Sequence, residues 1–208
     1  MTIALTTAAL AGVFSAYLCP YYIGWALCAL GALVSGLLAR ASGQRPEDAA
    51  FGVMYIAGPC ICLWWLRSIP HGITWCILVL TVTWATDICA YAVGSVMKGP
   101  KLWPRFSPNK TWSGFIGGLT GAVIAAVVLA AISHNLTLPT AAAVGLFGGL
   151  ATVGGDPWES MLKRRFGVKD SGDLIPGHGG ILDRVDGLMF AILAVAIVAR
   201  AVHAGLAA

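Results

Sequence analysis

The sequence predicts an all-α, polytopic integral membrane protein with about seven transmembrane helices and two large cytoplasmic loops. The 208 residues are 58% hydrophobic and only 11% charged, whereas soluble domains carry roughly 25% charged residues. Several apolar runs approach the roughly 20 residues that a helix needs to cross a bilayer. The basic residues gather between alternate runs, as expected for a chain that crosses a membrane repeatedly.

Seven apolar runs are the predicted spans of a single membrane domain covering residues 1–208. Only Cys19 and Pro20 separate the first two runs, which form either a tight hairpin or one bent segment. No basic residue precedes the short first run, so we do not expect a cleaved signal peptide. The predicted spans are residues 3–18, 21–39, 49–66, 73–95, 115–132, 140–155 and 187–203.

The basic residues fall mainly on one side of this topology. With the N-terminus in the cytoplasm, eleven of thirteen Lys and Arg residues lie in cytoplasmic segments, and only Arg67 and Arg200 lie opposite. This bias follows the positive-inside rule. The net charge of +4 therefore requires no nucleic-acid partner and fits anionic lipid headgroups or an anionic ligand. The eleven are Arg40, Arg45, Lys98, Lys101, Arg105, Lys110, Lys163, Arg164, Arg165, Lys169 and Arg184.

The first large loop, residues 96–114, holds four basic residues, three prolines and no acid. Ser107 followed by Pro108 predicts a helix start, because serine caps helices and proline fits the first helical position. Lys110 and Thr111 would then lie in the first turn, where free backbone N–H groups favour anions. The loop is either a basic membrane anchor or a phosphate-binding loop, and composition alone leaves both open.

The second large loop, residues 156–186, opens with a predicted helix in which Asp156 is the N-cap, Pro157 the first residue and Glu159 the third. Asp156 also ends an apolar span, where a carboxylate is costly without a metal ion or a lysine beside it. The following bases, residues 163–165, spread around the helix and contact either lipid headgroups or a substrate.

The loop continues with a glycine-rich stretch and ends in two carboxylates. His178, Gly179 and Gly180 predict a tight turn whose backbone can approach a ligand. Asp183 and Asp186 are three residues apart, which places both on one helix face. They either cap the last span or, together with Asp156, form an oxygen site for a hard divalent cation such as Mg²⁺, which proteins hold with one or two carboxylates plus substrate phosphates.

One more carboxylate, Asp87, lies inside the fourth predicted span. An aspartate within a transmembrane segment is a functional candidate by default. The alternative is a structural role, in which its side chain forms a hydrogen bond with Thr, Tyr or Trp of a neighbouring helix.

Four sequence segments together closely resemble the signature of phosphatidate cytidylyltransferases, also called CDP-diacylglycerol synthases. Four residues depart from the family pattern: Ser95, Ser113, Pro157 and Gly187. The resemblance covers about residues 84–190. The matching positions are Trp84, Asp87, Ala90, Tyr91 and Gly94; Ser107, Pro108, Lys110, Thr111, Trp112 and Gly114; Gly155, Asp156, Glu159, Ser160, Lys163 and Arg164; and Lys169, Asp170, Ser171, Gly172, Pro176, Gly177, His178, Gly179, Gly180, Leu182, Asp183, Arg184, Val185 and Asp186.

The resemblance implies transfer of a cytidylyl group from CTP to phosphatidate, with Mg²⁺ and a second cation as cofactors. It also implies an integral protein of the bacterial inner membrane, surrounded by membrane lipids, and a homodimer. The implied metal ligands are Asp156, Asp183, Asp186 and Glu159, and the implied catalytic residues are Asp156, Asp183, Asp186, Lys169 and Asp87. The implied substrate-binding residues are Ser107, Lys110, Thr111, Lys163, Arg164, His178, Gly179, Gly180 and Arg184.

Three other functions compete with this interpretation. A CTP-dependent kinase for a polyprenol or phytol-type lipid alcohol would release CDP instead of pyrophosphate. A transporter would use Asp87 as a coupling carboxylate, but the sequence shows no internal repeat of the kind that transporters often have. An inactive, interaction-only relative would account for the departures at Ser95 and Ser113, although the acidic positions are intact.

Overall fold

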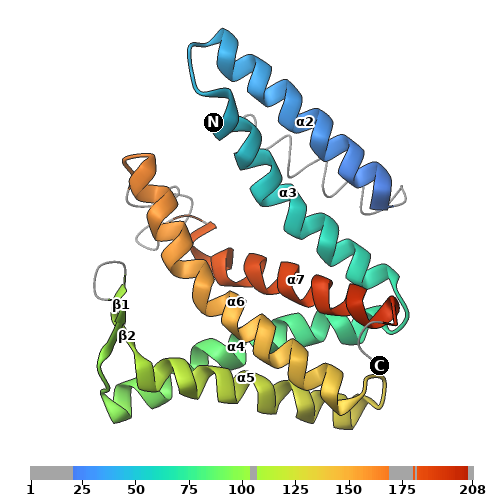
Figure 1. The fold of residues 1–208 in the computed structure, drawn as a ribbon, viewed down its shortest axis with the longest axis vertical. Helices are drawn as coiled ribbons and strands as arrows, with labels where there is room; N and C mark the ends of the chain where they lie inside the picture. Colours follow the sequence, from blue (N-terminus) through green and yellow to red (C-terminus); the bar gives the residue numbers. More distant parts are fainter. Residues whose placement is uncertain (1–20, 104–106, 169–179, 181, 206–208) are drawn as a thin grey trace. The chain divides into compact units, whose positions relative to one another are not determined.

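The computed structural model describes residues 21–103, 107–168, 180 and 182–205 (Figure 1). These residues form six long helices and one two-stranded antiparallel sheet. The predicted span at residues 3–18 lies outside the described residues. The elements are α2 (Tyr21–Ala41), α3 (Pro46–Ser68), α4 (Gly72–Met97), β1 (Lys101–Trp103), β2 (Ser107–Thr111), α5 (Trp112–Ser133), α6 (Leu138–Arg165) and α7 (Leu182–His203).

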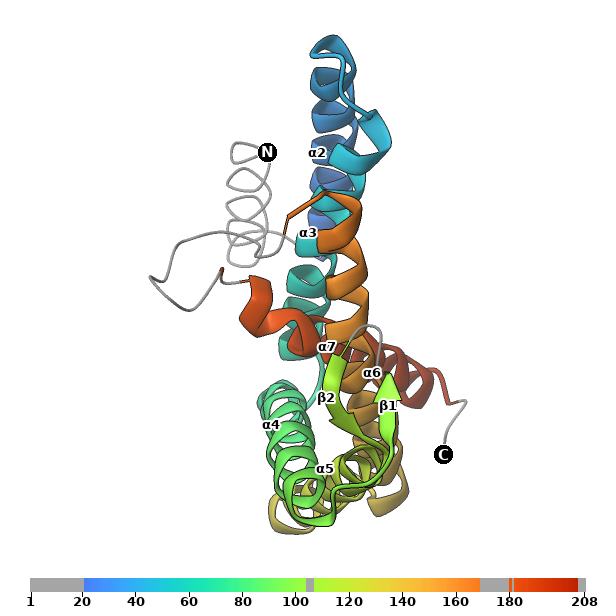
Figure 2. The ribbon, with the colours of Figure 1, turned by 90° about the vertical axis from the view of Figure 1, so that its left-hand side faces the viewer.

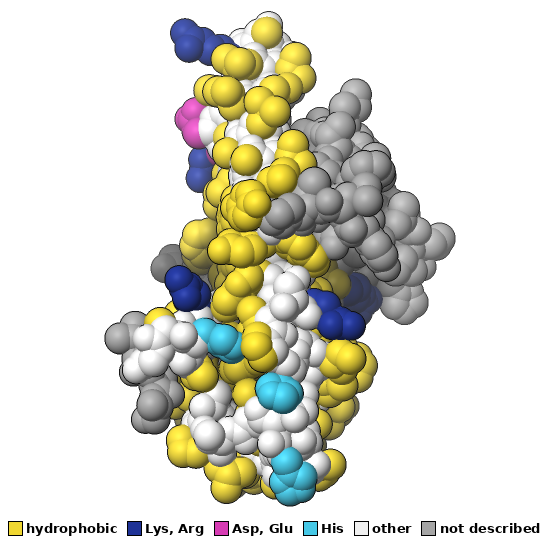
Figure 3. All heavy atoms as spheres, turned by 90° about the vertical axis from the view of Figure 1, so that its right-hand side faces the viewer, with side chains coloured by type: hydrophobic (Ala, Val, Ile, Leu, Met, Phe, Trp, Pro, Cys, Tyr) yellow, Lys and Arg dark blue, Asp and Glu magenta, His cyan; other side chains and the backbone are white. Residues whose placement is uncertain are grey.

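The six helices are long and apolar enough to cross a membrane, with 21 to 28 residues each. Hydrophobic side chains also cover much of the surface, as the face in Figure 3 shows. These features confirm the predicted class of helical membrane protein. Each helix extends beyond its predicted apolar run, most of all α6, which ends at Arg165 instead of residue 155.

The chain divides into two compact units, Met1–Pro70 and His71–Ala208. In the first unit, α2 and α3 pack together around four buried side chains. Pro46 occupies the start of α3, where its missing N–H is harmless. The four side chains are Cys28, Val53, Ala57 and Ile61. All the segments that resemble the family signature lie in the second unit.

In the second unit, α4 lies beside α5, and α6 packs against both α5 and α7 (Figure 1). Glycines set the spacing between these helices. A Cβ atom on Gly118 of α5 would lie 2.9 Å from the carbonyl oxygen of Thr86 on α4. A Cβ atom on Gly145 of α6 would lie 2.6 Å from Cα of Val123 on α5. Helices in lipid associate through such close packing, because hydrophobic burial does not drive them together there.

The predicted helix start at Ser107 and Pro108 is wrong. Residues Ser107–Thr111 form β2, which pairs antiparallel with β1, and α5 begins four residues later than Pro108, at Trp112. Thr111 is the N-cap, and its hydroxyl oxygen accepts a hydrogen bond from the N–H of Gly114 at 3.1 Å. A residue before proline is restricted to extended conformations, which suits Ser107 to a strand, while Thr111 supplies an equally good cap.

The predicted helix start at Asp156 is also wrong, because α6 runs without interruption from Leu138 to Arg165 with Pro157 inside it. Proline has no N–H and cannot donate to the carbonyl four residues earlier, which here belongs to Val153. The side chain of Lys110 compensates, since its Nζ lies 3.5 Å from the Val153 carbonyl oxygen. Asp156 and Glu159 therefore belong to the body of a long helix, and the second loop begins only after Arg165.

The glycine spacing leads to a first prediction. Gly145→Ala places a methyl group against the backbone of α5, so the variant should lose about 1–3 kcal/mol of stability, as overpacked sites do. Thermal unfolding in detergent measures the loss. Gly52→Ala is the matched control, because a Cβ atom at Gly52 meets nothing within 4 Å. Equal melting temperatures for the two variants would contradict the proposed packing.

Candidate active site

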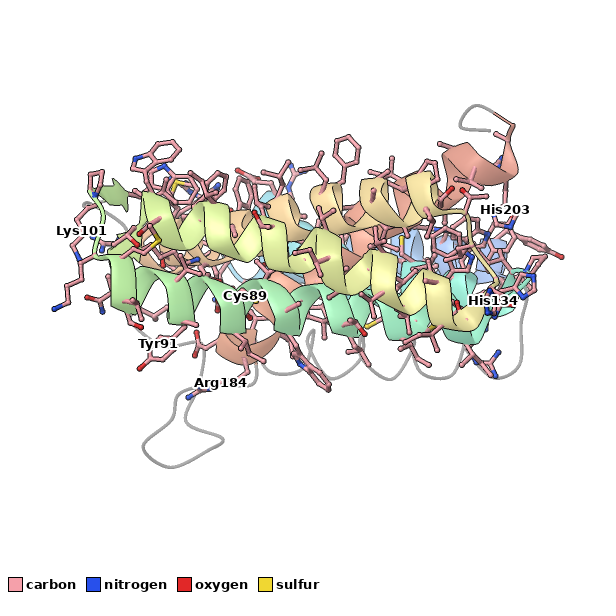
Figure 4. The ribbon with its side chains drawn as sticks, turned by 90° about the horizontal axis from the view of Figure 1, so that it is seen from below. Cys89, Tyr91, Lys101, His134, Arg184 and His203 are labelled. Carbon is pink, nitrogen blue, oxygen red and sulfur yellow. The ribbon has the colours of Figure 1, made fainter. Side chains whose placement is uncertain are left out.

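The candidate acidic and basic site residues that the structure describes gather at one end of α4–α7. Figure 2 shows the β1–β2 hairpin rising from the start of α5, and Figure 4 shows Lys101 of that hairpin at the opposite end of the helices from His134 and His203. The C-terminal part of α6 and the first turns of α7 contribute the acidic residues. The site therefore lies toward one end of the apolar helices, and it draws on segments far apart in the sequence.

A close crossing of α6 and α7 builds the acidic part of the site. A Cβ atom on Gly155 would lie 2.8 Å from Cα of Gly187 and 3.0 Å from the carbonyl oxygen of Asp186. On the other helix, a Cβ atom on Gly187 would lie 3.1 Å from Cγ2 of Thr152. Each glycine is next to a candidate carboxylate, so the crossing that they permit brings Asp156 close to Asp186.

Lys163 links the two helices by ion pairs. Its Nζ lies 2.8 Å from Oδ1 of Asp183 on α7 and 3.7 Å from Oε1 of Glu159 on its own helix. Glu159 is only 2% exposed, and its carboxyl group interacts with those of Asp183 and Asp186. A carboxylate this deeply buried is unfavourable unless a cation or a proton offsets its charge.

Backbone N–H groups fix two of these carboxylates. The N–H of Gly180 donates to Oδ2 of Asp183 at 2.8 Å, so Asp183 uses one oxygen for Lys163 and the other for the loop before α7. The N–H of Gly187 donates to Oδ1 of Asp186 at 2.7 Å. Gly180 thus contacts the acidic site, while the predicted turn at His178 and Gly179 lies outside the described residues.

A second ion pair joins the first loop to α6. The Nζ of Lys110, in β2, pairs with Oδ2 of Asp156. The same ammonium reaches the Val153 carbonyl, which Pro157 leaves without a helical donor. The pair is partly exposed, with 28% of the Lys110 side chain and 43% of the Asp156 side chain accessible. Lys110 is thus placed beside the carboxylates, as a phosphate-binding residue would be.

Asp87 faces the same region from α4. It interacts electrostatically with Asp156, Lys110 and Asp186. Within the described part of the chain, its carboxylate forms no hydrogen bond with a Thr, Tyr or Trp side chain, which was the predicted structural alternative. It is exposed and lies on one helix face with the exposed Trp84 and Tyr91. Asp87 therefore lies near the acidic site, and its functional role stays a prediction.

The structure describes only some of the remaining candidate residues. Lys169, His178 and Gly179 lie outside the described residues, and Ser107 is described only as part of β2. Thr111 is buried and caps α5, so its hydroxyl is already engaged. Arg164 and Arg184 are exposed at the same end as the acidic site.

Sequence reasoning missed three backbone features of the site. These are the Val153 carbonyl and the crossing glycines Gly155 and Gly187. The proline four residues after Val153 could have indicated the carbonyl without a helical donor. The glycine next to each candidate carboxylate could have indicated the close helix crossing.

The carboxylates fit a hard divalent cation in their chemistry but do not form a finished cage. Across the described residues, no group of three or more Asp, Glu, His or Cys side chains is arranged to hold a metal ion. Yet Oε1 of Glu159 is buried and accepts no hydrogen bond from any residue that the structure describes, and every candidate ligand is a carboxylate oxygen. Proteins usually hold Mg²⁺ with one or two carboxylates, and substrate phosphates supply further ligands. An incomplete set of carboxylates is therefore compatible with Mg²⁺.

Comparison with known proteins points in the same direction. A sequence model of the cytidylyltransferase family matches residues 1–202. The phosphatidate cytidylyltransferase of Brucella suis biovar 1 is 44% identical over 171 residues, which cover 80% of this chain and 63% of that protein. The enzyme of the same name from Staphylococcus saprophyticus is 43% identical over 151 residues, 70% of this chain and 56% of that protein. The chain thus matches less than two-thirds of the length of these relatives.

The α6–α7 crossing leads to a prediction with a neighbouring control. Gly155→Ala should force the two helices apart and lower the melting temperature, because the new methyl group overlaps the Gly187 backbone. Gly154→Ala changes the adjacent residue, where a Cβ atom meets nothing within 4 Å, and should melt as the parent does or slightly higher. Differential scanning fluorimetry in detergent compares them. A Gly155→Ala variant as stable as Gly154→Ala would refute the close crossing.

Proposed function

The chain belongs to the cytidylyltransferase family, and we propose that it transfers the cytidylyl group of CTP to phosphatidate, giving CDP-diacylglycerol and pyrophosphate. One observation carries the proposal: carboxylates from α6 and α7 meet lysines from β2 and α6 at one end of a set of apolar helices. Acids and bases together suit a metal-bound polyphosphate better than either sign of charge alone. The names of the relatives supply the substrates.

The reaction needs alignment and charge neutralisation more than a protein nucleophile. A phosphate oxygen of phosphatidate attacks the α-phosphorus of CTP, and the bond from that phosphorus to the bridging oxygen of the β-phosphate breaks. The electron pair leaves with pyrophosphate, so no covalent enzyme intermediate is required. Lys110 and Lys163 hold phosphate oxygens during this exchange, since both ammonium groups already stand beside the carboxylates.

A bound Mg²⁺ supplies charge compensation for the triphosphate and for the leaving pyrophosphate. Asp156, Glu159, Asp183 and Asp186 are the residues that would hold it. Asp183 and Asp186 are oriented for this role by the N–H groups of Gly180 and Gly187. Asp87 lies beside this set and adds negative charge on the α4 side.

The position of the site suits one water-soluble and one membrane-bound substrate. CTP reaches the site from the water, while phosphatidate stays in the bilayer with its headgroup at the level of the basic residues. Arg164 and Arg184, exposed at this end, attract anionic headgroups. We infer that this end faces the cytoplasm of a bacterial inner membrane. A homodimer and a second cation remain predictions from the family resemblance.

The first test follows the α-phosphate of labelled CTP in lipid–detergent micelles with phosphatidate and Mg²⁺. Label in the lipid fraction, dependent on phosphatidate and accompanied by pyrophosphate, is the expected result. Label found only in water-soluble CDP would indicate a lipid-alcohol kinase or a CTP hydrolase instead. No turnover by folded protein would favour an inactive relative.

Asp183→Asn should lower the rate of this transfer by about 100-fold or more, because it removes charge where phosphate and metal charges must be balanced. Membrane insertion should be unchanged, since only one oxygen atom is replaced by an NH₂ group. Glu47→Gln, an exposed acid in the first turn of α3, is the control and should keep parental activity. Retained transfer by Asp183→Asn would remove Asp183 from the site.

Orientation is tested in a variant whose six native cysteines are replaced by serine. Single cysteines are then introduced at the two ends of the second unit, at Lys101 and at His203 (Figure 4). Both positions are exposed. In intact cells, a membrane-impermeant maleimide should label His203→Cys, and in inside-out vesicles it should label Lys101→Cys. Labelling with the opposite sidedness would show that the active end faces away from the cytoplasm.

A further inference from the structure

The ammonium group of Lys163 stands where a divalent cation would find its ligands. Its Nζ lies 2.8 Å from Asp183 and 3.7 Å from Glu159. These are two of the four carboxylates that would hold Mg²⁺ under the function proposed above. The second of them, Glu159, is 2% exposed, and one of its carboxylate oxygens has no hydrogen-bond donor among the described residues. Among the described residues, Lys163 therefore places a positive charge beside a carboxylate that is almost closed to solvent.

A lysine and a divalent cation compete for such oxygens. The ammonium group satisfies part of the negative charge, and two positive centres a few ångströms apart in a poorly solvated site repel each other strongly. Lysine has a flexible four-carbon stem, so its ammonium can move while its backbone stays in the helix. The Lys163 side chain is 21% exposed, which leaves it a path out of the cluster.

We propose that Lys163 is an internal counterion that keeps the carboxylates of α6 and α7 paired until CTP arrives. This inference rests on the proposed function and concerns how the binding of CTP and the binding of the divalent cation are coupled. The triphosphate draws the ammonium of Lys163 away from Asp183 and Glu159, and the divalent cation takes its place on these oxygens. Metal and nucleotide therefore bind together, and each raises the affinity for the other, since coupling between two ligands is reciprocal.

This role predicts an effect of Lys163 on metal binding without nucleotide. Removing its charge should free the carboxylates and tighten the binding of a divalent cation, although it removes a residue from the phosphate site. The expected gain is about tenfold, within the range of 5–150-fold that typical coupling energies produce. A purely structural ion pair would give the opposite result, because its loss would loosen the α6–α7 contact and weaken any site there.

The test is a Mn²⁺ titration of the purified protein in detergent, without nucleotide, with free Mn²⁺ measured by electron paramagnetic resonance. Lys163→Met should bind Mn²⁺ about tenfold more tightly than the parent. Lys163→Arg keeps the charge and should bind Mn²⁺ like the parent. Lys101→Met removes an exposed lysine of β1 and controls for the change in net charge.

A second measurement examines how Lys163 affects the binding of CTP. Binding of labelled CTP at saturating Mn²⁺ should be weaker for Lys163→Met than for Lys101→Met, because the ammonium no longer reaches the phosphates. Unchanged or weaker Mn²⁺ binding by folded Lys163→Met would overturn the inference, as would an equal gain in Lys101→Met. The Mn²⁺ result does not depend on turnover. Failure of the parent protein to transfer label would count against the proposed function alone.

Discussion

The close crossing of α6 and α7 is the constraint on which the site depends. Gly155 and Gly187 let the two backbones approach until a single methyl group would overlap. Because Asp156 and Asp186 are the immediate neighbours of these glycines, the same approach that packs the helices concentrates negative charge. One contact therefore determines both the packing of α6 against α7 and the position of the carboxylates. A substitution that separates the two helices should change both.

Two lysines make this concentration of charge tolerable. Lys163 joins α6 to Asp183 of α7, and Lys110 joins β2 to Asp156. Pro157 contributes to the second pair, since it leaves the Val153 carbonyl available to the Lys110 ammonium. The lysines that neutralise the carboxylates in the free protein are also the bases best placed to bind phosphates. When a polyphosphate binds, each lysine therefore exchanges an ion pair with a carboxylate for an ion pair with a phosphate.

The sequence predicted the membrane class and six of the long apolar helices, because the length of an apolar run is a local signal. For Asp156 it predicted either a metal ion or a lysine as the partner, and the structure shows Lys110 there. The starts of two helices were predicted wrongly. Pro108 and Pro157 both resembled first helical residues, but one lies in a strand and the other inside a long helix. Tertiary contacts determine both helix starts. Local sequence propensity does not report the strand pairing at Thr111 or the close approach of the helices at Gly155. Lys169 and His178 lie outside the described residues, and their roles stay predictions.

Zero-length cross-linking tests the central claim most directly. A water-soluble carbodiimide activates a carboxylate and joins it to a lysine amine only when the two are in contact. Applied to the membrane-embedded protein and followed by peptide mass spectrometry, it should link Lys163 to Asp183 and Lys110 to Asp156, whose side chains form ion pairs. Both links should become weaker with Mn²⁺ and CTP. Links from these lysines to other acids, with neither predicted link found, would contradict the crossing and the site built on it.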